Sequence, residues 1–223
     1  MKTISIVDYG MGNLNSVEKA FELAIFNQNL QNKLNIKITN DRDEIKNSDA
    51  IVLPGVGAFG AAMQNLKNFE MVDTLREIAI VEKKPFLGIC LGYQLLFEKS
   101  YEEGEYNGLG IIKGEVRKFD EKAGLKIPHM GWNTVDFGKN VSFLLKQEFN
   151  SSTCSDLYFY FVHSYFVEIG EGFSGDVFLT EYGKKFAAGI QFENIVGLQF
   201  HPEKSQENGI KLLKSWCNKV YGK

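Results

Sequence analysis

Short apolar runs alternate with segments of helical periodicity through the first half of the chain. Residues 3–8 form a β-branched run, and apolar residues then recur at i, i+3, i+4, i+7 and i+8 from Val17 to Ile25, behind Ser16 as a candidate cap. This pattern predicts a strand followed by a helix. Its repetition implies right-handed crossovers and a mostly parallel central sheet flanked by helices. Further strands are predicted at residues 35–40, 49–55 and 84–89, and further helices at 58–66, 71–82 and 93–99.

The second half of the chain changes to consecutive strands and ends in a helix. This last helix follows Ser205, a candidate cap, and carries an apolar stripe that includes Trp216 and Cys217. The polar segment 27–35 is expected to be a surface insertion. We expect one α/β domain over residues 1–223, with an antiparallel β extension in its second half. The strands of this half are predicted at 108–119, 127–137, 157–169, 175–183 and, as a hairpin, 186–203.

Composition and charge narrow the classes of function. The chain has 223 residues, 44% of them hydrophobic, which suits a soluble globular domain with its own core. Lys and Arg number 25 against 28 Asp and Glu, a net charge of -3, so a nucleic-acid partner is not expected. The N-terminal apolar run is too short and polar for a signal peptide, and no stretch reaches the roughly 18 apolar residues of a membrane span. A cytoplasmic location is expected.

The cysteines point to a free thiol. Cys90, Cys154 and Cys217 are an odd number at wide, irregular spacing, which suits neither a disulfide framework nor a zinc site. Cys154 lies in a polar stretch and Cys217 on a helical stripe, and neither has a histidine close in sequence, so both are interpreted as structural or incidental. Cys90 remains as the candidate for chemistry.

Cys90 stands between a buried strand and an expected helix, in the sequence Gly-Ile-Cys-Leu-Gly. A nucleophile on such a strained turn brings the residues two before and two after it together, which explains Gly88 and Gly92. The N-terminus of a helix favours a thiolate, and the Leu91 amide could donate to an oxyanion. The alternative is a buried structural cysteine beside a tight turn.

Two further segments supply groups that such a nucleophile needs. Pro202 biases His201 toward an extended conformation, in which Glu203 projects to the same side and can orient the imidazole. By itself, the sequence His-Pro-Glu is better explained by a turn after a strand. Nucleophile, base and orienting carboxylate together form the arrangement for covalent acyl transfer. At 54–57 the sequence Pro-Gly-Val-Gly could turn an amide toward an oxyanion, although glycine at a strand end is also ordinary turn chemistry.

These segments, in the order PGVGAFG, LGICLGYQLLFE and GLQFHPEKS, resemble the class I, triad-type glutamine amidotransferases. More narrowly, IVDYGMGNLNSV, IPHMGWN and YFYFVHSY resemble the family of glutaminase subunits of imidazole glycerol phosphate synthases. The resemblance runs from residue 4 to about residue 215. It implies the fold of that class, hydrolysis of L-glutamine to L-glutamate and ammonia, no cofactor and no metal. It also implies a heterodimer with a (β/α)8-barrel synthase (cyclase) subunit of histidine biosynthesis, which makes imidazole glycerol phosphate and AICAR.

The resemblance also implies a role for individual residues. Cys90 would form a γ-glutamyl thioester, His201 would move the proton, and Glu203 would orient His201. The oxyanion would be held by amides of Leu91 and of the loop Gly55, Val56 and Gly57. The amino-acid end of glutamine would be held by Gln94, Ser164 and Tyr165. The synthase, and the exit of ammonia, would lie toward His129, Met130, Gly131 and Trp132.

Alternatives remain open at this stage. Paralogous subunits with the same triad serve synthases that amidate sugars of surface polysaccharides, and a non-catalytic binding subunit could carry the triad as a relic. Apart from the resemblance, His129 and His163 are interpreted as satisfied core or edge histidines, and Trp132 as a core residue. Gln206 departs from the family pattern, since many members have glycine there.

Overall fold

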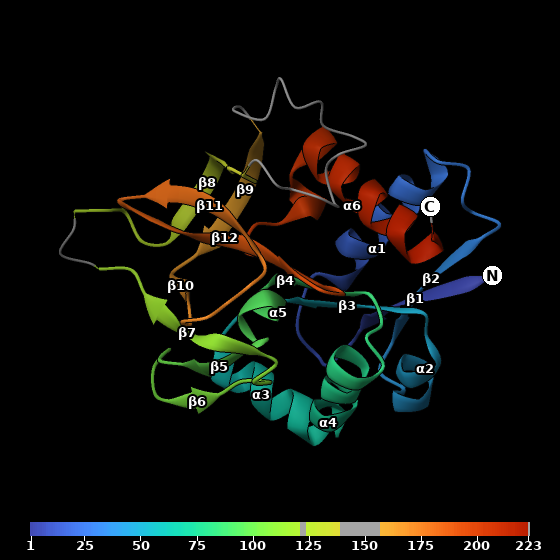
Figure 1. The fold of residues 1–223 in the computed structure, drawn as a ribbon, viewed down its shortest axis with the longest axis horizontal. Helices are drawn as coiled ribbons and strands as arrows, with labels where there is room; N and C mark the ends of the chain where they lie inside the picture. Colours follow the sequence, from blue (N-terminus) through green and yellow to red (C-terminus); the bar gives the residue numbers. More distant parts are fainter. Residues whose placement is uncertain (121–123, 139–156, 223) are drawn as a thin grey trace.

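A twisted sheet runs through the computed structural model, which describes residues 1–120, 124–138 and 157–222 (Figure 1). Within these residues the sheet has eleven strands, and five neighbouring strands at one end are parallel. The other strands extend the sheet mainly by antiparallel pairing. The parallel strands are β2 (Leu34–Thr39), β1 (Lys2–Val7), β3 (Ala50–Gly55), β4 (Phe86–Cys90) and β13 (Ile195–Leu198).

The antiparallel extension predicted for the second half is confirmed. Beyond β13 the sheet continues through β12 (Lys184–Phe192), β10 (Tyr165–Ile169), β7 (Ile112–Lys118), β5 (Phe97–Ser100) and β6 (Tyr106–Asn107). β5 and β7 are the parallel neighbours within this part. β11 (Asp176–Tyr182) pairs with β12 beside this path, and β8 (His129–Thr134) and β9 (Tyr158–His163) form a separate two-stranded sheet.

Helices cover both faces of the parallel strands, because side chains alternate along each strand. Ile6 and Leu87 pack on one face with α1 (Leu14–Phe26) and α6 (Gln206–Tyr221). Leu53 packs on the other face with α3 (Phe59–Asn68) and α4 (Met71–Arg76), and Figure 1 shows the two helix layers on opposite sides of the sheet. No helix among the described residues is long and apolar enough to span a membrane.

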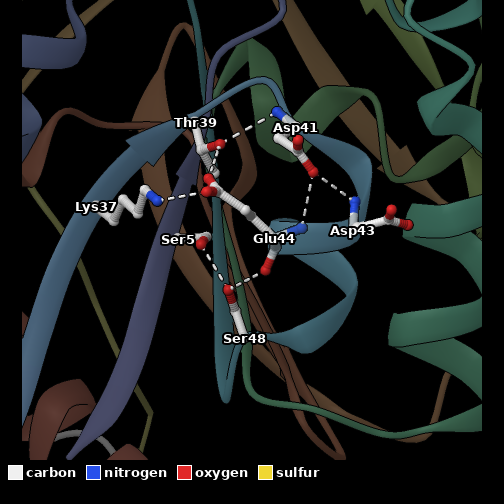
Figure 2. A network of polar contacts seen from close by, with 7 residues as sticks. All are labelled: Ser5, Lys37, Thr39, Asp41, Asp43, Glu44 and Ser48. Atoms are coloured by element: carbon white, nitrogen blue, oxygen red, sulfur yellow. Dashed lines mark hydrogen bonds and ion pairs between the residues drawn. The ribbon is translucent and has the colours of Figure 1, made fainter.

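Helix α2 (Arg42–Asn47) illustrates how polar residues position the smaller elements (Figure 2). The Asp41 carboxylate accepts hydrogen bonds from the amides of Asp43 and Glu44 at 2.8 and 3.0 Å, which caps the helix. The Glu44 carboxylate in turn binds Thr39 and Lys37 of strand β2. The polar contacts therefore tie the helix to the end of the strand before it.

The helix predicted at 93–99 is wrong beyond its first turn. Helix α5 covers only Leu91–Gln94, and strand β5 begins at Phe97. The carbonyls of Leu95 and Leu96 accept hydrogen bonds from the backbone of residues 109–112, which places this run in the sheet region. Leu95, Leu96 and Phe97 are fully buried. An apolar run that is buried on all sides shows no alternation of apolar and polar residues, so its sequence cannot distinguish a helix from a strand.

Three local predictions are corrected. The run 157–169 forms two strands in different sheets, divided at Ser164, because backbone pairing partners differ on its two sides. Helix α1 begins at Leu14, so Ser16 lies inside it. Ser205 does precede α6, but its hydroxyl donates to the His201 carbonyl at 2.6 Å and accepts from the Tyr160 amide at 3.0 Å instead of capping the helix.

Two other features noted in the sequence can be placed in the structure. The segment 27–35 is largely exposed, as expected of an insertion, although Leu30 and Leu34 anchor it in the core. Gln206 has φ +50°, a left-handed conformation that glycine adopts without strain. The departure from glycine noted at this position therefore carries a backbone cost in this chain.

Candidate active site

Cys90 lies at a strained turn where strand β4 meets helix α5. Its backbone has φ +54° and ψ -109°, a combination that L residues rarely adopt. Such strained conformations occur most often at functional sites. A Cβ on Gly88 would lie 2.8 Å from the Gly92 carbonyl oxygen, and one on Gly92 would lie 1.8 Å from the Leu53 carbonyl oxygen. Both glycines are therefore required by close approach: Gly88 approaches the backbone at Gly92, as predicted, whereas Gly92 approaches Leu53 of strand β3.

The Pro-Gly-Val-Gly loop lies beside this turn. Strands β3 and β4 are parallel neighbours whose register pairs Gly55 with Cys90. Gly57 has φ +104°, and the Val56 side chain is 41% exposed. Gly55 is needed for close packing, because a Cβ there would lie 3.0 Å from the Leu91 Cβ and 2.3 Å from the Tyr9 hydroxyl. The backbone of the loop is thus held against the start of α5.

His201 and Glu203 form a buried pair. The Nδ1 of His201 lies 2.7 Å from the Oε1 of Glu203, and both side chains are almost fully buried. Since a carboxylate accepts, Nδ1 carries a proton and donates it, which leaves Nε2 as the reactive nitrogen. Nε2 is buried with no hydrogen-bond partner among the residues described here. The His201 amide donates to the Tyr160 carbonyl at 2.9 Å, which fixes the backbone of this residue.

The electrostatic environment keeps His201 charged. Burial lowers its pKa, but negative charge on the Cys90 sulfur, the hydrogen bond to Glu203 and the charge of that carboxylate outweigh burial and raise the pKa to about 10. A protonated imidazole beside a sulfur nucleophile is the state from which a proton can be delivered to a leaving group. Cys90 thus comes together with His201 and Glu203 from two separate segments of the chain.

A cavity of about 310 Å³ opens in front of Cys90. Its volume is at the lower end of the roughly 300–1,000 Å³ typical of small-molecule sites. Val56, Gly57 and Leu91 line it together with the predicted substrate residues Gln94, Ser164 and Tyr165. Glu102, Pro128, Val162 and His163 complete the lining and were not predicted as substrate residues.

Gln199 and Tyr9 contribute to the site and were missed by sequence reasoning. The Gln199 amide nitrogen lies 3.8 Å from the Cys90 sulfur, and its carbonyl oxygen accepts from Gln94 at 2.9 Å. Gln199 lies just beyond the end of strand β13, two residues before His201, so its closeness to His201 in the sequence is the signal that could have drawn attention to it. The buried Tyr9 hydroxyl donates to the Pro54 carbonyl at 2.8 Å. Tyr9 gave no sequence signal, because this contact depends on β1 and β3 being neighbours.

Strand β8 divides the four residues expected to face a partner. Met130 and Trp132 are 59% and 47% exposed, and Gly131 is half-buried. His129 is only 4% exposed, since alternation along the strand turns it inward. The His129 side chain therefore does not lie on the exposed surface of this chain, and the expected role of all four residues toward a partner stays a prediction. The exposure of Trp132 also corrects its interpretation as a core residue.

The other cysteines lie apart from this site. Cys217 is fully buried in α6, where burial raises the pKa of its thiol, so it is inert as a nucleophile. Cys154 lies outside the described residues. Among the residues that the structure describes, no cluster of three or more His, Cys, Asp or Glu side chains could hold a metal ion.

Comparison with known sequences gives a consistent family. A family model described as glutamine amidotransferase class-I matches residues 5–220. The chain is 47% identical over 220 residues to the imidazole glycerol phosphate synthase subunit HisH of Aquifex aeolicus, covering 99% of this chain and 98% of that protein. It is 46% identical to the imidazole glycerol phosphate synthase subunit HisH 1 of Campylobacter jejuni (strain RM1221), covering 96% and 98%.

Solved structures share the fold at low sequence identity. A structure titled as a glutamine amidotransferase aligns with a TM-score of 0.69 at 14% identity, covering 99% of both chains. The glutaminase domain of Trypanosoma brucei CTPS, solved with bound acivicin, aligns with a TM-score of 0.67 at 15% identity, covering 99% of this chain and 94% of that one. The predicted fold class is therefore confirmed.

Proposed function

Because the chain belongs to the class-I glutamine amidotransferase family, we propose that it hydrolyses L-glutamine to L-glutamate and ammonia and passes the ammonia to a synthase subunit. The observation that carries this proposal is the Cys90 turn, which faces a cavity and has the buried His201–Glu203 pair beside it. We treat residues 1–223 as one glutaminase domain.

Acylation follows from the state of His201. The Cys90 sulfur attacks the γ-carboxamide carbon of glutamine, and the C=O electron pair moves onto oxygen. The protonated Nε2 of His201 gives its proton to the amide nitrogen as the C–N bond breaks, so ammonia leaves and a γ-glutamyl thioester remains. Glu203 keeps Nδ1 protonated and stabilises the imidazolium before the proton is transferred.

The oxyanion needs donors on the loop side of Cys90. Leu91 is the first residue of α5, so its amide has no acceptor within the helix. An amide of the loop Gly55, Val56 and Gly57 would be the second donor, since β3 pairs Gly55 directly with Cys90. Donors already in position cost little reorganisation during the reaction, which is why such holes contribute strongly to catalysis.

Deacylation reverses the roles of the same groups. The neutral Nε2 of His201 takes a proton from water as the water oxygen attacks the thioester carbon, and the C–S bond breaks to regenerate the thiolate with protonated His201. The product leaves as the γ-carboxylic acid, which releases its proton to solvent to give glutamate. Gln94, together with the backbone at Ser164 and Tyr165, would bind the amino-acid end of the substrate. All three residues line the cavity that contains Cys90.

The partner we propose is a (β/α)8-barrel cyclase subunit of histidine biosynthesis, which would use the ammonia to make imidazole glycerol phosphate and AICAR. Both relatives are named as subunits of imidazole glycerol phosphate synthase. Exposed Met130 and Trp132, close in sequence to the cavity residue Pro128, are the surface we propose for the partner. Free thiols at Cys90 and Cys217 fit the reducing cytoplasm.

The test is a glutaminase assay of the subunit alone and with the barrel subunit, with and without its nucleotide substrate. We expect Cys90→Ala to abolish glutamate release by the complex while synthase activity on added ammonium salts stays near the wild-type value, because only the ammonia source is lost. Loss of both activities, or of neither, would contradict the proposal.

Two controls separate the other functions. A glutamine-mimicking electrophile should label Cys90 in the complex, whereas complete inertness with the partner present would indicate a relic triad. Purification from the native host should bring down the histidine-pathway cyclase. Recovery of a sugar amidotransferase instead would keep the glutaminase chemistry and overturn the pathway.

A further inference from the structure

The geometry points to a positioning role for the buried pair His129 and His163. We propose that this pair holds the Tyr165 carbonyl, and through it Gln94, in the geometry that binds glutamine, and that it links this anchor to strand β8. The inference rests on the proposed glutaminase function and names two residues that the triad does not include. Neither histidine touches the reacting atoms in this account, so both are positioning residues.

The first part of the link runs from β8 to the cavity. On β8, the Asn133 amide nitrogen lies 3.2 Å from the Nε2 of His129. The Nδ1 of His129 lies 2.9 Å from the Nε2 of His163. The Nδ1 of His163 lies 2.7 Å from the Tyr165 carbonyl oxygen. β8 and β9 are antiparallel, and their register pairs His129 directly with His163. The contacts thus follow from the pairing of the two strands.

The acceptor at the end of this series determines every proton in it. A carbonyl can only accept, so the Nδ1 of His163 carries the hydrogen and its Nε2 has a lone pair. The Nδ1 of His129 must then donate to that lone pair, and its Nε2 accepts from the Asn133 amide. Each ring is neutral and held in one tautomer. A proton added to either ring would place two N–H groups against each other or against the amide.

The second part of the link runs from Tyr165 to Cys90. The Tyr165 carbonyl also accepts from the Gln94 amide nitrogen at 3.0 Å. The same nitrogen donates to the Gln199 carbonyl oxygen at 2.9 Å, and the Gln199 amide nitrogen lies 3.8 Å from the Cys90 sulfur. Two acceptors therefore hold the amide nitrogen of Gln94, and this fixes the orientation of the whole amide group, including its carbonyl oxygen. We call the hydrogen-bonded series from Asn133 through the two histidines and Tyr165 to Gln94 the relay. It ends where a substrate would lie, since Gln94, His163 and Tyr165 all line the cavity.

Packing keeps both rings in place and uncharged. His129 is stacked on Tyr182 with ring centroids 4.1 Å apart, and on Phe161 at 4.8 Å. Phe119 and Phe186 contact His163 at 5.4 Å. Burial lowers the pKa of His129 to about 4 and that of His163 to about 3. Rings that stay neutral at physiological pH and cannot rotate are suited to fix a carbonyl, and unsuited to act as acids or bases.

The position of His129 gives the link its second end. His129 faces inward from β8, whereas Met130 and Trp132 of the same strand are exposed. A partner seated on these two side chains would act on the strand that begins the hydrogen-bonded series. The hydrogen-bonded series would therefore couple the position of β8 to the Gln94 anchor.

Paired amide variants test the relay, because asparagine places an amide near the Nδ1 position of histidine and glutamine places one near Nε2. His163→Asn retains a donor for the Tyr165 carbonyl, whereas His163→Gln loses it. In the complex we expect H163Q to raise KM for glutamine by about tenfold and H163N by less than about threefold, since a lost buried hydrogen bond has an effect of this size. Likewise, His129→Leu should raise KM by more than His129→Asn, which retains a donor for His163.

Tyr182→Phe is the matched control, because it keeps the ring stacked on His129 and loses only a hydroxyl that donates to the Lys126 carbonyl. Its KM should equal the wild-type value. Thermal melting and alkylation of Cys90 by a small neutral reagent should be alike in H163Q and H163N, which separates positioning from folding. If H163Q does not fold, the His129 pair decides the question.

Two results would overturn the relay. One is that H163N and H163Q have the same KM and that His129→Asn and His129→Leu also have the same KM. The other is a change confined to kcat. These results differ from failure of the proposed function, in which the wild-type complex itself releases no glutamate.

Discussion

At the scale of single residues, the Glu203 carboxylate determines what His201 can do. It accepts the Nδ1 proton at 2.7 Å, and it contributes to the pKa of about 10 that keeps His201 protonated at neutral pH. The hydrogen bond selects the tautomer, and the negative charge stabilises the imidazolium. These two contributions can be separated by a change that keeps the geometry of the side chain and removes its charge.

Glu203→Gln is that change. The glutamine carbonyl can still accept from Nδ1, but the charge is lost, so the pKa of His201 should fall. We expect kcat to drop by at least about a hundredfold with little change in KM, because the imidazolium acts in the proton-transfer steps and not in substrate binding. The pH dependence of kcat should show its alkaline limb at lower pH than in the wild type. An unchanged alkaline limb would show that Glu203 does not control the His201 charge.

At the scale of elements, the site is built where the ends of neighbouring strands meet. β3 and β4 bring the Pro-Gly-Val-Gly loop to Cys90, and β13 leads into the segment that contains His201. β1 contributes indirectly, because Tyr9, just beyond its end, donates to the Pro54 carbonyl. That hydrogen bond anchors the start of the loop whose amide we propose for the oxyanion.

Tyr9→Phe tests this anchor. Removing the hydroxyl leaves the Pro54 carbonyl without its buried donor, so the loop should be less well ordered. We expect kcat of the complex to fall by about tenfold while KM for glutamine is unchanged, since the oxyanion develops only in the transition state.

Tyr93→Phe is the matched control. Tyr93 is also fully buried, and its hydroxyl has no hydrogen-bond partner among the described residues. The Tyr93 variant should retain the wild-type kcat in the same steady-state assay. Equal losses of kcat in both variants would assign the effect to core packing and not to the loop.

At the scale of the whole molecule, buried histidines of opposite character set limits on stability at both ends of the pH range. His129 and His163 have folded-state pKa values of about 4 and about 3, below the ordinary value of 6.5. His201 has a folded-state pKa of about 10, above it. Below about pH 6.5 the unfolded chain binds more protons at these three histidines than the folded chain, and above that pH it binds fewer.

The free energy of unfolding should be greatest near pH 6.5 as far as these three groups are concerned. Below that pH the unfolded chain takes up protons at positions 129 and 163 that the folded chain excludes, so stability falls toward pH 4. Above it the folded chain holds a proton on His201 that the unfolded chain releases, so stability falls as the pH rises through about 10.

Urea unfolding at about pH 5, 6.5 and 9 measures this dependence. His163→Asn should lose less stability than the wild type on acidification, because asparagine does not titrate. Cys90→Ala should lose less on alkalinisation, because the sulfur no longer raises the pKa of His201. Parallel pH profiles for the wild type and both variants would contradict the assignment of these groups.

Much of this molecule could be predicted from local patterns. The alternation of strands and helices up to residue 90 predicted the parallel sheet and its two helix layers, since strand and helix periods reflect burial on one or two faces. Gly88 and Gly92 predicted the strained turn, because only close approach requires glycine at both positions. The spacing of His201 and Glu203 predicted their contact, which is local. The extent of a single domain over 1–223 stays a prediction.

Other features depended on contacts between distant segments. The run after Gln94 contains only large apolar residues, so its own pattern could not choose between helix and strand, and pairing with residues 109–112 decided it. The division of the run 157–169 at Ser164 was decided in the same way, because β9 and β10 pair in two different sheets. Ser205 is a residue type that often caps a helix, but its hydroxyl instead binds the Tyr160 amide and the His201 carbonyl, both from outside α6.

The sequence by itself determined the strands and most of the helices up to residue 90, the turn at Cys90 and the contact of His201 with Glu203, because each depends on residues close together in the chain. Only the tertiary structure decided that Tyr9 anchors Pro54, that Gln199 connects Gln94 with Cys90, and that His129 faces inward to meet His163. The physical reason is that a hydrogen bond between distant residues depends on strand order and register. Those properties follow from burial across the whole sheet, and no short segment of the sequence contains them.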